Sequence, residues 1–433
     1  MARDVQGNLL AGADSVTAAG FDTALESFCL YRGDPVAAID AAIAASPRCG
    51  MAHLLKAWLY ALATEPAAAQ AAQGFVATAR DCGGGPREAA HAQALGQVLA
   101  GDWRAGGITL ERWQADAPHD LLALLAGHLI DFFIADARSL RDRVGRVLPL
   151  WQGVPGAPWV MGMGAFGLEE AGDYARAEAM GRAALAADPR DSWAHHAVAH
   201  VMEMMGRPED GVGWMTARQA HWAGADNFLK VHNWWHLALC HLELDDVPGA
   251  LALYDGPVRS GGAGVAMALL DASALLWRID LSGADVGTRW DELSLKWETH
   301  EAPGFYAFND LHAAMAHLGA GRFDRAERLL QGAGGQSEAA GWMRRHGLPL
   351  IEGFMAFRRG DFDRAVDRLM TARHISGAFG GSHAQRDVID WTLTEAALRG
   401  GMTGVAQALS RERLALRPHS PVNLGFLRRA ASS

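Results

Sequence analysis

Residues 166–189 read FGLEEAGDYARAEAMGRAALAADP, and this stretch decides the expected fold. Gly172 and Asp173 separate two segments that are rich in the helix-forming residues Ala, Leu, Glu and Arg. A glycine at this point ends the first helix, and the small Ala177 lets the second helix pack closely against it. The stretch therefore predicts a helical hairpin.

The same phrase, a small residue, a polar turn and a second small residue five positions on, recurs along the chain. Its copies begin at Gly33, Gly101, Gly172, Gly206, Gly321 and Gly360, and Asp245 begins a copy without glycine. Successive copies lie 34 to 39 residues apart or about twice that. A period near 34 is typical of tetratricopeptide repeats, in which each unit is a helical hairpin. We therefore expect an all-α, tetratricopeptide-like helical-hairpin solenoid (superhelix) with irregular repeats, without a sheet, as one continuous domain over residues 1–433.

Composition narrows the class of protein. The chain has 433 residues, of which 50% are hydrophobic, and a formal net charge of −10, which argues against a broad nucleic-acid surface. Its four cysteines are dispersed and form no CxxC pair, so neither a disulfide framework nor a thiolate zinc site is expected. No secretory signal and no apolar run of bilayer length is visible. These features predict a cytoplasmic protein without nucleic-acid or membrane partners.

Histidines concentrate in residues 191–244, which hold seven of the eighteen. His196 and His200 are four residues apart, and Glu203 follows three later, so all three project from one helical face. His232 and His236 repeat the spacing. Because neighbouring units of a solenoid present equivalent faces side by side, these side chains are expected to meet in one polar pocket, with Asn309 and His312 close by. The candidate catalytic residues are His196, His200, Glu203, His232 and His236. The candidate ligand-binding residues are Asn233, Trp235, Asn309, Asp310, His312, Arg386 and Asp387.

Two chemistries fit the histidines. Paired with a carboxylate they serve as a general acid or base near neutral pH. No separate metal motif supports them, so the primary expectation is a site without a cofactor. The alternative is Zn²⁺ or another divalent metal held by His196, His200, His232 and His236. A structural interpretation also stands, in which the histidines are hydrogen-bonded between helices and the tryptophans pack the core.

Two further groups have both a structural and a functional interpretation. Ser382 and Gln385 form a capping-box pattern, after which Arg386 is either an ion-pair partner or an anchor for a ligand carboxylate or phosphate. His128 and Asp131 lie three apart on one expected helix and reach the same cavity if the array closes.

Several phrases together resemble the tetratricopeptide repeat protein 38 family. They are FGLE at 166–169, HAVAH at 196–200 followed by Glu203, HNWWH at 232–236, FNDLH at 308–312, GGSHAQRD at 380–387 and RPHSP at 417–421. The resemblance covers most of the chain and is weakest before residue 45. His195, His241 and His317 fall outside its pattern. It implies an all-helical repeat fold and no particular reaction.

These observations lead to one functional expectation and two alternatives. The first is binding of a small polar ligand or a peptide segment in a His-rich concave pocket. The second is a hydrolase or lyase that uses the same residues, and the third is a protein-interaction scaffold. The sequence leaves open the ligand, whether the pocket is catalytic, its metal content and the oligomeric state.

Overall fold

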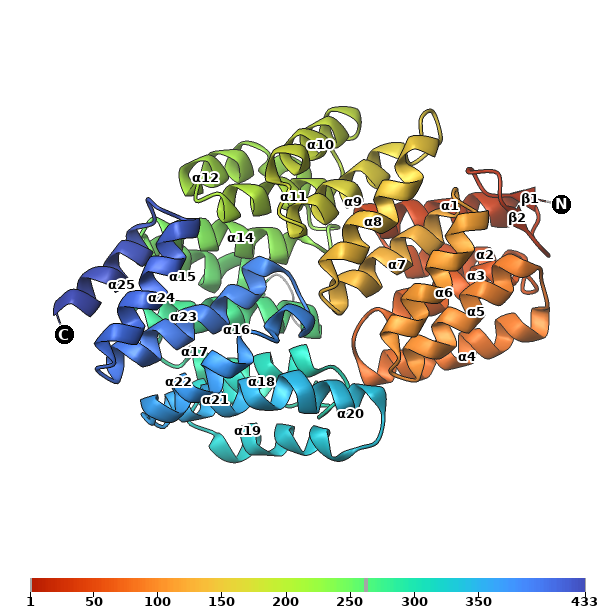
Figure 1. Ribbon diagram of the computed structural model, residues 1–433. Helices are drawn as coiled ribbons and strands as arrows, with labels where there is room; N and C mark the ends of the chain where they lie inside the picture. Colours follow the sequence, from red (N-terminus) through yellow and green to blue (C-terminus); the bar gives the residue numbers. More distant parts are fainter. Residues whose placement is uncertain (1, 261–263, 433) are drawn as a thin grey trace. The chain divides into compact units, whose positions relative to one another are not determined.

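The computed structural model describes residues 2–260 and 264–432, and this part of the chain is almost entirely helical (Figure 1). Strands β1 (Ala2–Arg3) and β2 (Leu9–Leu10) form a single antiparallel pair in the described residues. Packing divides the chain into two compact units, Met1–Val198 with His221–Leu229, and Ala199–Ala220 with Lys230–Ser433. Two helices contribute to both units, namely α11 (Ser192–Met204) and α13 (Gln219–Trp222).

The first unit is built from consecutive helical hairpins. Its helices are α1 (Ser15–Leu30), α2 (Pro35–Ala45), α3 (Gly50–Ala61), α4 (Pro66–Cys82), α5 (Pro86–Leu99), α6 (Trp103–Asp116), α7 (Leu121–Phe133), α8 (Ala137–Val147), α9 (Ala157–Glu170) and α10 (Tyr174–Ala187), with a 3₁₀ turn, η1 (Leu148–Leu150). Each odd-numbered helix from α1 to α9 packs on the next helix of the chain. Helix α10 packs most extensively on α9, as the stretch 166–189 predicts.

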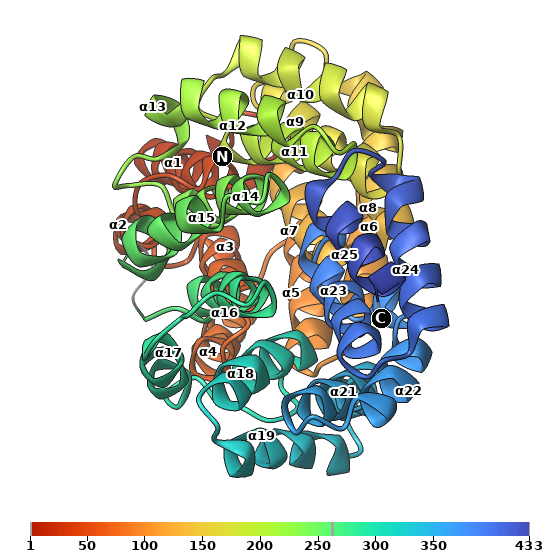
Figure 2. The same cartoon turned by 90° about the vertical axis from the view of Figure 1, so that its left-hand side faces the viewer.

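The second unit continues the pattern with less regular spacing. Its helices are α12 (Pro208–Ala217), α14 (Lys230–Glu243), α15 (Val247–Leu253), α16 (Ala266–Leu281), α17 (Arg289–Trp297), α18 (Ala307–Gly319), α19 (Phe323–Leu329), α20 (Glu338–Trp342), α21 (Leu348–Arg358), α22 (Phe362–Ala372), α23 (His383–Arg399), α24 (Thr403–Leu416) and α25 (Pro421–Ser432). Short 3₁₀ or π turns are η2 (Tyr254–Val258), η3 (Leu330–Gly334), η4 (Met343–Gly347) and η5 (Ser376–Ala378). Helices α14, α16, α18, α21 and α23 pack on one another in succession. Within this unit α17, α19, α22 and α24 lie on the outer side of that row (Figure 2).

The recurring phrase forms the hairpin turns. All six of its glycines adopt a left-handed backbone, with φ between 64° and 88°, and Asp245 in the copy without glycine takes φ 63°. In five of the seven copies the next residue is an aspartate that caps the following helix, as Asp173 does by accepting from Arg176 N. The phrase thus ends one helix and begins the next.

The small residue of the phrase lies where the two helices of a hairpin touch. Ala177, Ala326 and Ala365 are almost completely buried. At Gly106 a Cβ atom would come within 2.6 Å of Val98 Cγ2, so only glycine fits without displacement. These contacts confirm the predicted all-α, tetratricopeptide-like hairpin architecture. The single continuous domain stays a prediction beside the two compact units. In the described part of the chain, no helix combines the length and apolarity needed to cross a bilayer.

Candidate functional site

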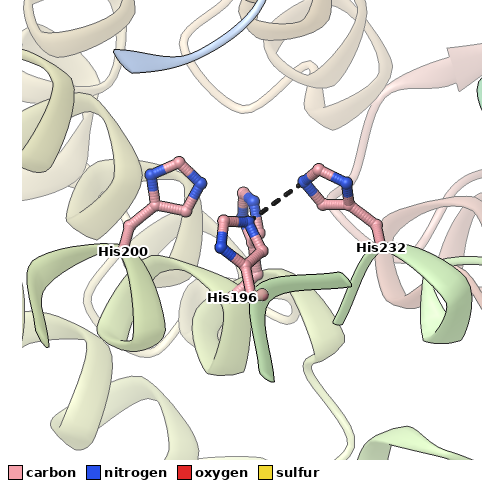
Figure 3. Close-up of side chains that lie close together, drawn as sticks. His196, His200 and His232 are labelled. Carbon is pink, nitrogen blue, oxygen red and sulfur yellow. Dashed lines mark hydrogen bonds between the residues drawn. The ribbon is translucent and has the colours of Figure 1, made fainter. Parts of the chain in front are cut away.

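In the second unit, three of the predicted histidines lie together. His200 comes from the last turns of α11, and His232 and His236 come from α14. A ring nitrogen of each lies within 4.8 Å of a ring nitrogen of the others, and the three side chains are at most 7% exposed. His196 lies one turn before His200 on α11 and on the same helical face (Figure 3). The four-residue spacings therefore place imidazoles where a shared ligand could reach them.

Two of these imidazoles are each oriented by a buried carboxylate. His232 Nδ1 lies 2.9 Å and 3.0 Å from the two carboxylate oxygens of Asp271 on α16. His236 Nδ1 lies 3.1 Å from Glu203 Oε2. One assignment is that each Nδ1–H donates to its carboxylate, which fixes the tautomer and puts the ring lone pair on Nε2. Asp271 and Glu203 are 1% and 7% exposed, so these contacts are shielded from water.

The Nε2 atoms of the two rings face each other. His236 Nε2 lies 3.2 Å from His232 Nε2. With both Nδ1 atoms protonated, two neutral imidazoles would direct lone pair against lone pair, which is repulsive. In this tautomer a cation between the nitrogens, either an added proton or a metal ion, makes the contact favourable, whereas a protonated Glu203 that donates to His236 Nδ1 would let His236 Nε2–H donate to His232 Nε2. A cation between the two rings is thus one of the two arrangements that this contact allows.

Trp235 fixes the orientation of the two rings on α14. Its ring stacks on His232 with a centroid separation of 5.2 Å and an interplanar angle of 13°. It meets His236 edge to face at 4.7 Å. Arg278 of α16 lies over the same indole, 5.6 Å from the ring centroid. The tryptophan is thus packed between the histidines and a buried guanidinium.

Burial shifts the titration of the charged groups near the histidines. Desolvation raises the pKa of Glu203 to about 7, against the opposing effects of His200, Arg417 and Arg278. Desolvation lowers the pKa of Arg278 to about 10, although Asp387 and Glu203 oppose the shift. Arg278 donates to the carbonyl oxygens of Ala274 at 3.1 Å and Ala384 at 2.7 Å. Glu203 is consequently a carboxyl group beside these histidines that can exchange a proton near neutral pH.

Three predicted ligand-binding residues keep unsatisfied polar atoms in the interior. Asn233 is fully buried, and neither its amide oxygen nor its amide nitrogen has a hydrogen-bond partner among the described residues. The same is true of the indole nitrogen of Trp235. His312 donates from Nδ1 to the carbonyl of Phe308 at 2.7 Å, and its Nε2 has no described partner. Burial lowers the pKa of His312 to about 4, so this nitrogen is an acceptor at neutral pH. Such atoms are costly to bury without a ligand or a water molecule.

The other predicted ligand-binding residues have structural contacts. Asp387 pairs with Arg413 at 2.8 Å and with Arg417 at 3.1 Å, and these arginines hold its pKa well below the usual value. Asp310 accepts from Gly304 N at 2.9 Å and so fastens the turn before α18. Asn309 is partly exposed on α18. Arg386 donates to the carbonyls of Gly380 and Gly381, beside the predicted capping box of Ser382 and Gln385, which is present. A ligand role for these four stays a prediction.

Histidines outside the repeated spacing also have structural partners. His195 contacts the carbonyl of Pro189, and His241 contacts Asp246 at the start of α15. His317 lies between Ser294 and Glu301. In the first unit, Asp131 is held by Arg143 through two contacts of 2.6 Å and 3.0 Å, so its ionic partner is structural.

Sequence reasoning missed Asp271 and Arg278. They are charged, buried and seven positions apart in the mainly apolar helix AMALLDASALLWRIDL, two turns along one face of α16. A carboxylate and a guanidinium among the apolar residues of this helix are the signal that could have found them.

Comparisons with known proteins found only remote structural likenesses. No family model matches the chain. A structure of the human IFIT1 dimer with m7Gppp-AAAA is 13% identical, with a TM-score of 0.45 over 98% of this chain and 96% of that one. The APC/C hetero-tetramer Cut9-Hcn1 is 12% identical, with a TM-score of 0.46 over 96% of this chain and 76% of that one. A tetratricopeptide repeat protein from Parabacteroides merdae is 14% identical, with a TM-score of 0.36 over 62% of this chain and 96% of that one. Likeness at this level carries no inference about function.

Proposed function

We propose that this tetratricopeptide-like protein binds a divalent transition-metal ion through His200, His232 and His236, and a small polar ligand beside it. The observation that carries the proposal is the Nε2–Nε2 separation of 3.2 Å between His232 and His236. Two nitrogens at about 2.0–2.1 Å from a tetrahedral Zn²⁺ are themselves about 3.3 Å apart. The separation thus fits two ligands of one ion.

The outer contacts support the same assignment. Metal-binding histidines in proteins usually donate their second ring N–H to a carboxylate, which raises the basicity of the coordinating nitrogen. His232 with Asp271, and His236 with Glu203, both have this arrangement. His200 supplies a third ring nitrogen, and His196 is the candidate fourth ligand from the same face of α11. Imidazole ligands suit Zn²⁺, Co²⁺, Ni²⁺ and Fe²⁺.

The small polar ligand is proposed from the unsatisfied interior atoms. Three imidazole ligands leave one tetrahedral position open, as in catalytic zinc sites. Asn233 offers both a donor and an acceptor, and His312 offers an acceptor. A small molecule with complementary donors and acceptors would relieve the cost of burying these atoms.

The test is a metal measurement on variants. Purified protein is expected to contain about one equivalent of metal by elemental analysis, or to bind Co²⁺ with visible ligand-field bands. His232→Ala and His236→Ala should each abolish binding. His241→Ala is the matched control, because His241 lies on the same helix α14 and contacts Asp246 instead. Absence of metal together with no thermal shift on adding Zn²⁺, Co²⁺ or Fe²⁺ would refute the proposal. Retention of metal by His196→Ala would identify the three-ligand, open form.

A hydrolase or lyase is the second candidate, and Glu203 favours it. This carboxyl group contacts His236 and has a pKa raised to about 7, which suits a general acid or base at neutral pH. Glu203→Gln should then keep the metal, with weaker affinity, and lose turnover in a screen of ester, amide and phosphoester substrates. Equal turnover by the wild-type protein and Glu203→Gln would show that Glu203 has no catalytic role.

We further propose that the chain is a relative of the tetratricopeptide repeat protein 38 family and is cytoplasmic. The phrases at 196–200, 232–236, 308–312 and 380–387 support the relationship, and the four unpaired cysteines fit a reducing compartment. Fractionation of cells expressing a tagged chain tests the location.

A further inference from the structure

The first unit contains a small cavity whose lining includes none of the histidines of the proposed metal site. Its walls come from the end of α1, from α7 and α9, and from the start of α11. The space is large enough for about one water molecule. The lining residues are Cys29, Tyr31, Leu125, His128, Trp159, Met163, Asp191 and Trp193. Three of these side chains carry a buried polar atom without a hydrogen-bond partner among the described residues, namely His128, Asp191 and Trp193.

Asp191 is the acidic group of this cavity. Only one of its two carboxylate oxygens is used in capping a helix. One carboxylate oxygen accepts from Ala194 N at 3.0 Å at the start of α11. The other oxygen, Oδ2, is buried and has no partner among the described residues, although the residue is only 1% exposed. Gly162 of α9 leaves room for it, because a Cβ atom there would lie 2.3 Å from Oδ2.

Asp120 occupies the corresponding position two repeats earlier. Its contacts show which partner Asp191 lacks. Asp120 follows Pro118 and caps α7, as Asp191 follows Pro189 and caps α11. Asp120 is fully buried, and its carboxylate receives a two-pronged contact from Arg87 at 2.9 Å, as well as His91 and Trp113. Asp191 has an equally buried carboxylate and no such cation. A buried anion is normally paired with a positive group.

The remaining walls suit a cation and supply no charge of their own. Tyr31 and Trp193 stack with centroids 5.6 Å apart, and aromatic faces attract cations. Burial lowers the pKa of His128 to about 3, so its ring is neutral at pH 7 and offers one acceptor nitrogen. Burial also raises the pKa of the Cys29 thiol and of the Tyr31 phenol, which keeps both uncharged. Trp159 is partly exposed, which gives this side of the wall access to solvent.

We propose that this cavity binds the primary ammonium group of a small amine. The Asp191 carboxylate is the counter-ion, the neutral ring of His128 accepts one ammonium N–H, and the aromatic rings cover the charge. The ammonium group is close to a water molecule in size, which matches the volume of the cavity. The substituent of the amine extends toward solvent past Trp159. The proposal is independent of the metal site.

Methylammonium chloride is the probe, compared with sodium chloride at equal ionic strength and at pH 8, where Asp191 is ionised. Wild-type protein is expected to show heat of binding by calorimetry and a higher melting temperature in methylammonium. Asp191→Asn keeps the size and the capping oxygen and should weaken binding roughly tenfold or more. Gly162→Ala should abolish binding by closing the space beside Oδ2. Asp173→Asn is the matched control, because Asp173 caps α10 at a partly exposed position and should leave binding unchanged.

Three results would overturn the proposal. Equal melting temperatures in the two salts would mean that the cavity holds only water. Equal affinity of Asp191→Asn and wild-type protein for methylammonium would show that Asp191 is not the counter-ion. Tighter binding of tetramethylammonium, which has no N–H to donate and exceeds the space, would exclude the proposed hydrogen-bonded geometry. If Asp191→Asn fails to fold, Gly162→Ala decides the question, because it keeps the charge of Asp191 and removes the space beside Oδ2.

Discussion

Replacement of Asp271 by Asn tests the metal site without removing a proposed ligand. Both oxygens of this carboxylate lie within 3.0 Å of His232 Nδ1, and the residue is 1% exposed. Asn retains the shape and one acceptor oxygen but loses the negative charge that makes His232 Nε2 more basic. An amide can also turn its NH₂ group toward Nδ1, which would favour the tautomer that cannot coordinate. Metal affinity should therefore fall while the fold is retained.

The size of the effect follows from the role of the contact. Loss of a carboxylate partner of a metal-binding histidine typically costs 10–100-fold in affinity, or about 1.4–2.7 kcal/mol. The full effect is expected here because water cannot replace the carboxylate at 1% exposure. Competition with a chromophoric chelator measures the dissociation constant for Zn²⁺. Chemical unfolding of the metal-free protein, measured in parallel, gives the change in stability.

Asp280→Asn on the same helix separates affinity from stability. Asp280 accepts from Trp290 Nε1 at 2.9 Å and contacts Arg358, and neither of these partners is a proposed metal ligand. Its variant should lower the free energy of unfolding by roughly 1–3 kcal/mol and leave metal affinity unchanged. Wild-type affinity in Asp271→Asn, with a normal value for Asp280→Asn, would refute the carboxylate–histidine–metal assignment.

The remaining predictions concern the first unit and the hairpin turns. Burial raises the folded-state pKa of Asp191 to about 7, above its unfolded value of about 3.9. In amine-free buffer the free energy of unfolding should therefore fall as the pH rises between these two values, by up to about 1.4 kcal/mol per pH unit. Asp191→Asn should flatten the profile in urea unfolding, and an unchanged slope would contradict the assignment. Asp245→Gly should stabilise the protein by about 1 kcal/mol, because Asp245 holds φ 63°, and a lower melting temperature would argue against this. Gly211→Ala should cost about 1–3 kcal/mol, since its Cβ would lie 2.6 Å from Cys240 Sγ, and a neutral calorimetric result would show that the sulfur moves freely.

Much of the local structure could be predicted because its causes are local. The left-handed turn at Gly172, the cap at Asp173 and the close packing at Ala177 depend on residues within a few positions of one another. The same holds for the capping box of Ser382 and Gln385. The four-residue spacing of His232 and His236 likewise fixes their common face, because a helix turns through about 100° per residue.

Partners from distant parts of the chain were decided only by tertiary packing. Nothing near His232 in sequence indicates Asp271, which is 39 positions away, and nothing distinguishes the paired Asp387 from the unpaired Asp191. Asp120 and Asp191 occupy the same place in their repeats, yet one receives Arg87 and the other receives no cation from the described chain. The physical reason is that helix periodicity assigns a side chain to a face, whereas its partner is whichever group the packing of another helix brings within about 3 Å. Sequence by itself therefore determined the hairpins and the faces of the histidines, and the tertiary structure alone decided which charges are neutralised within the described chain.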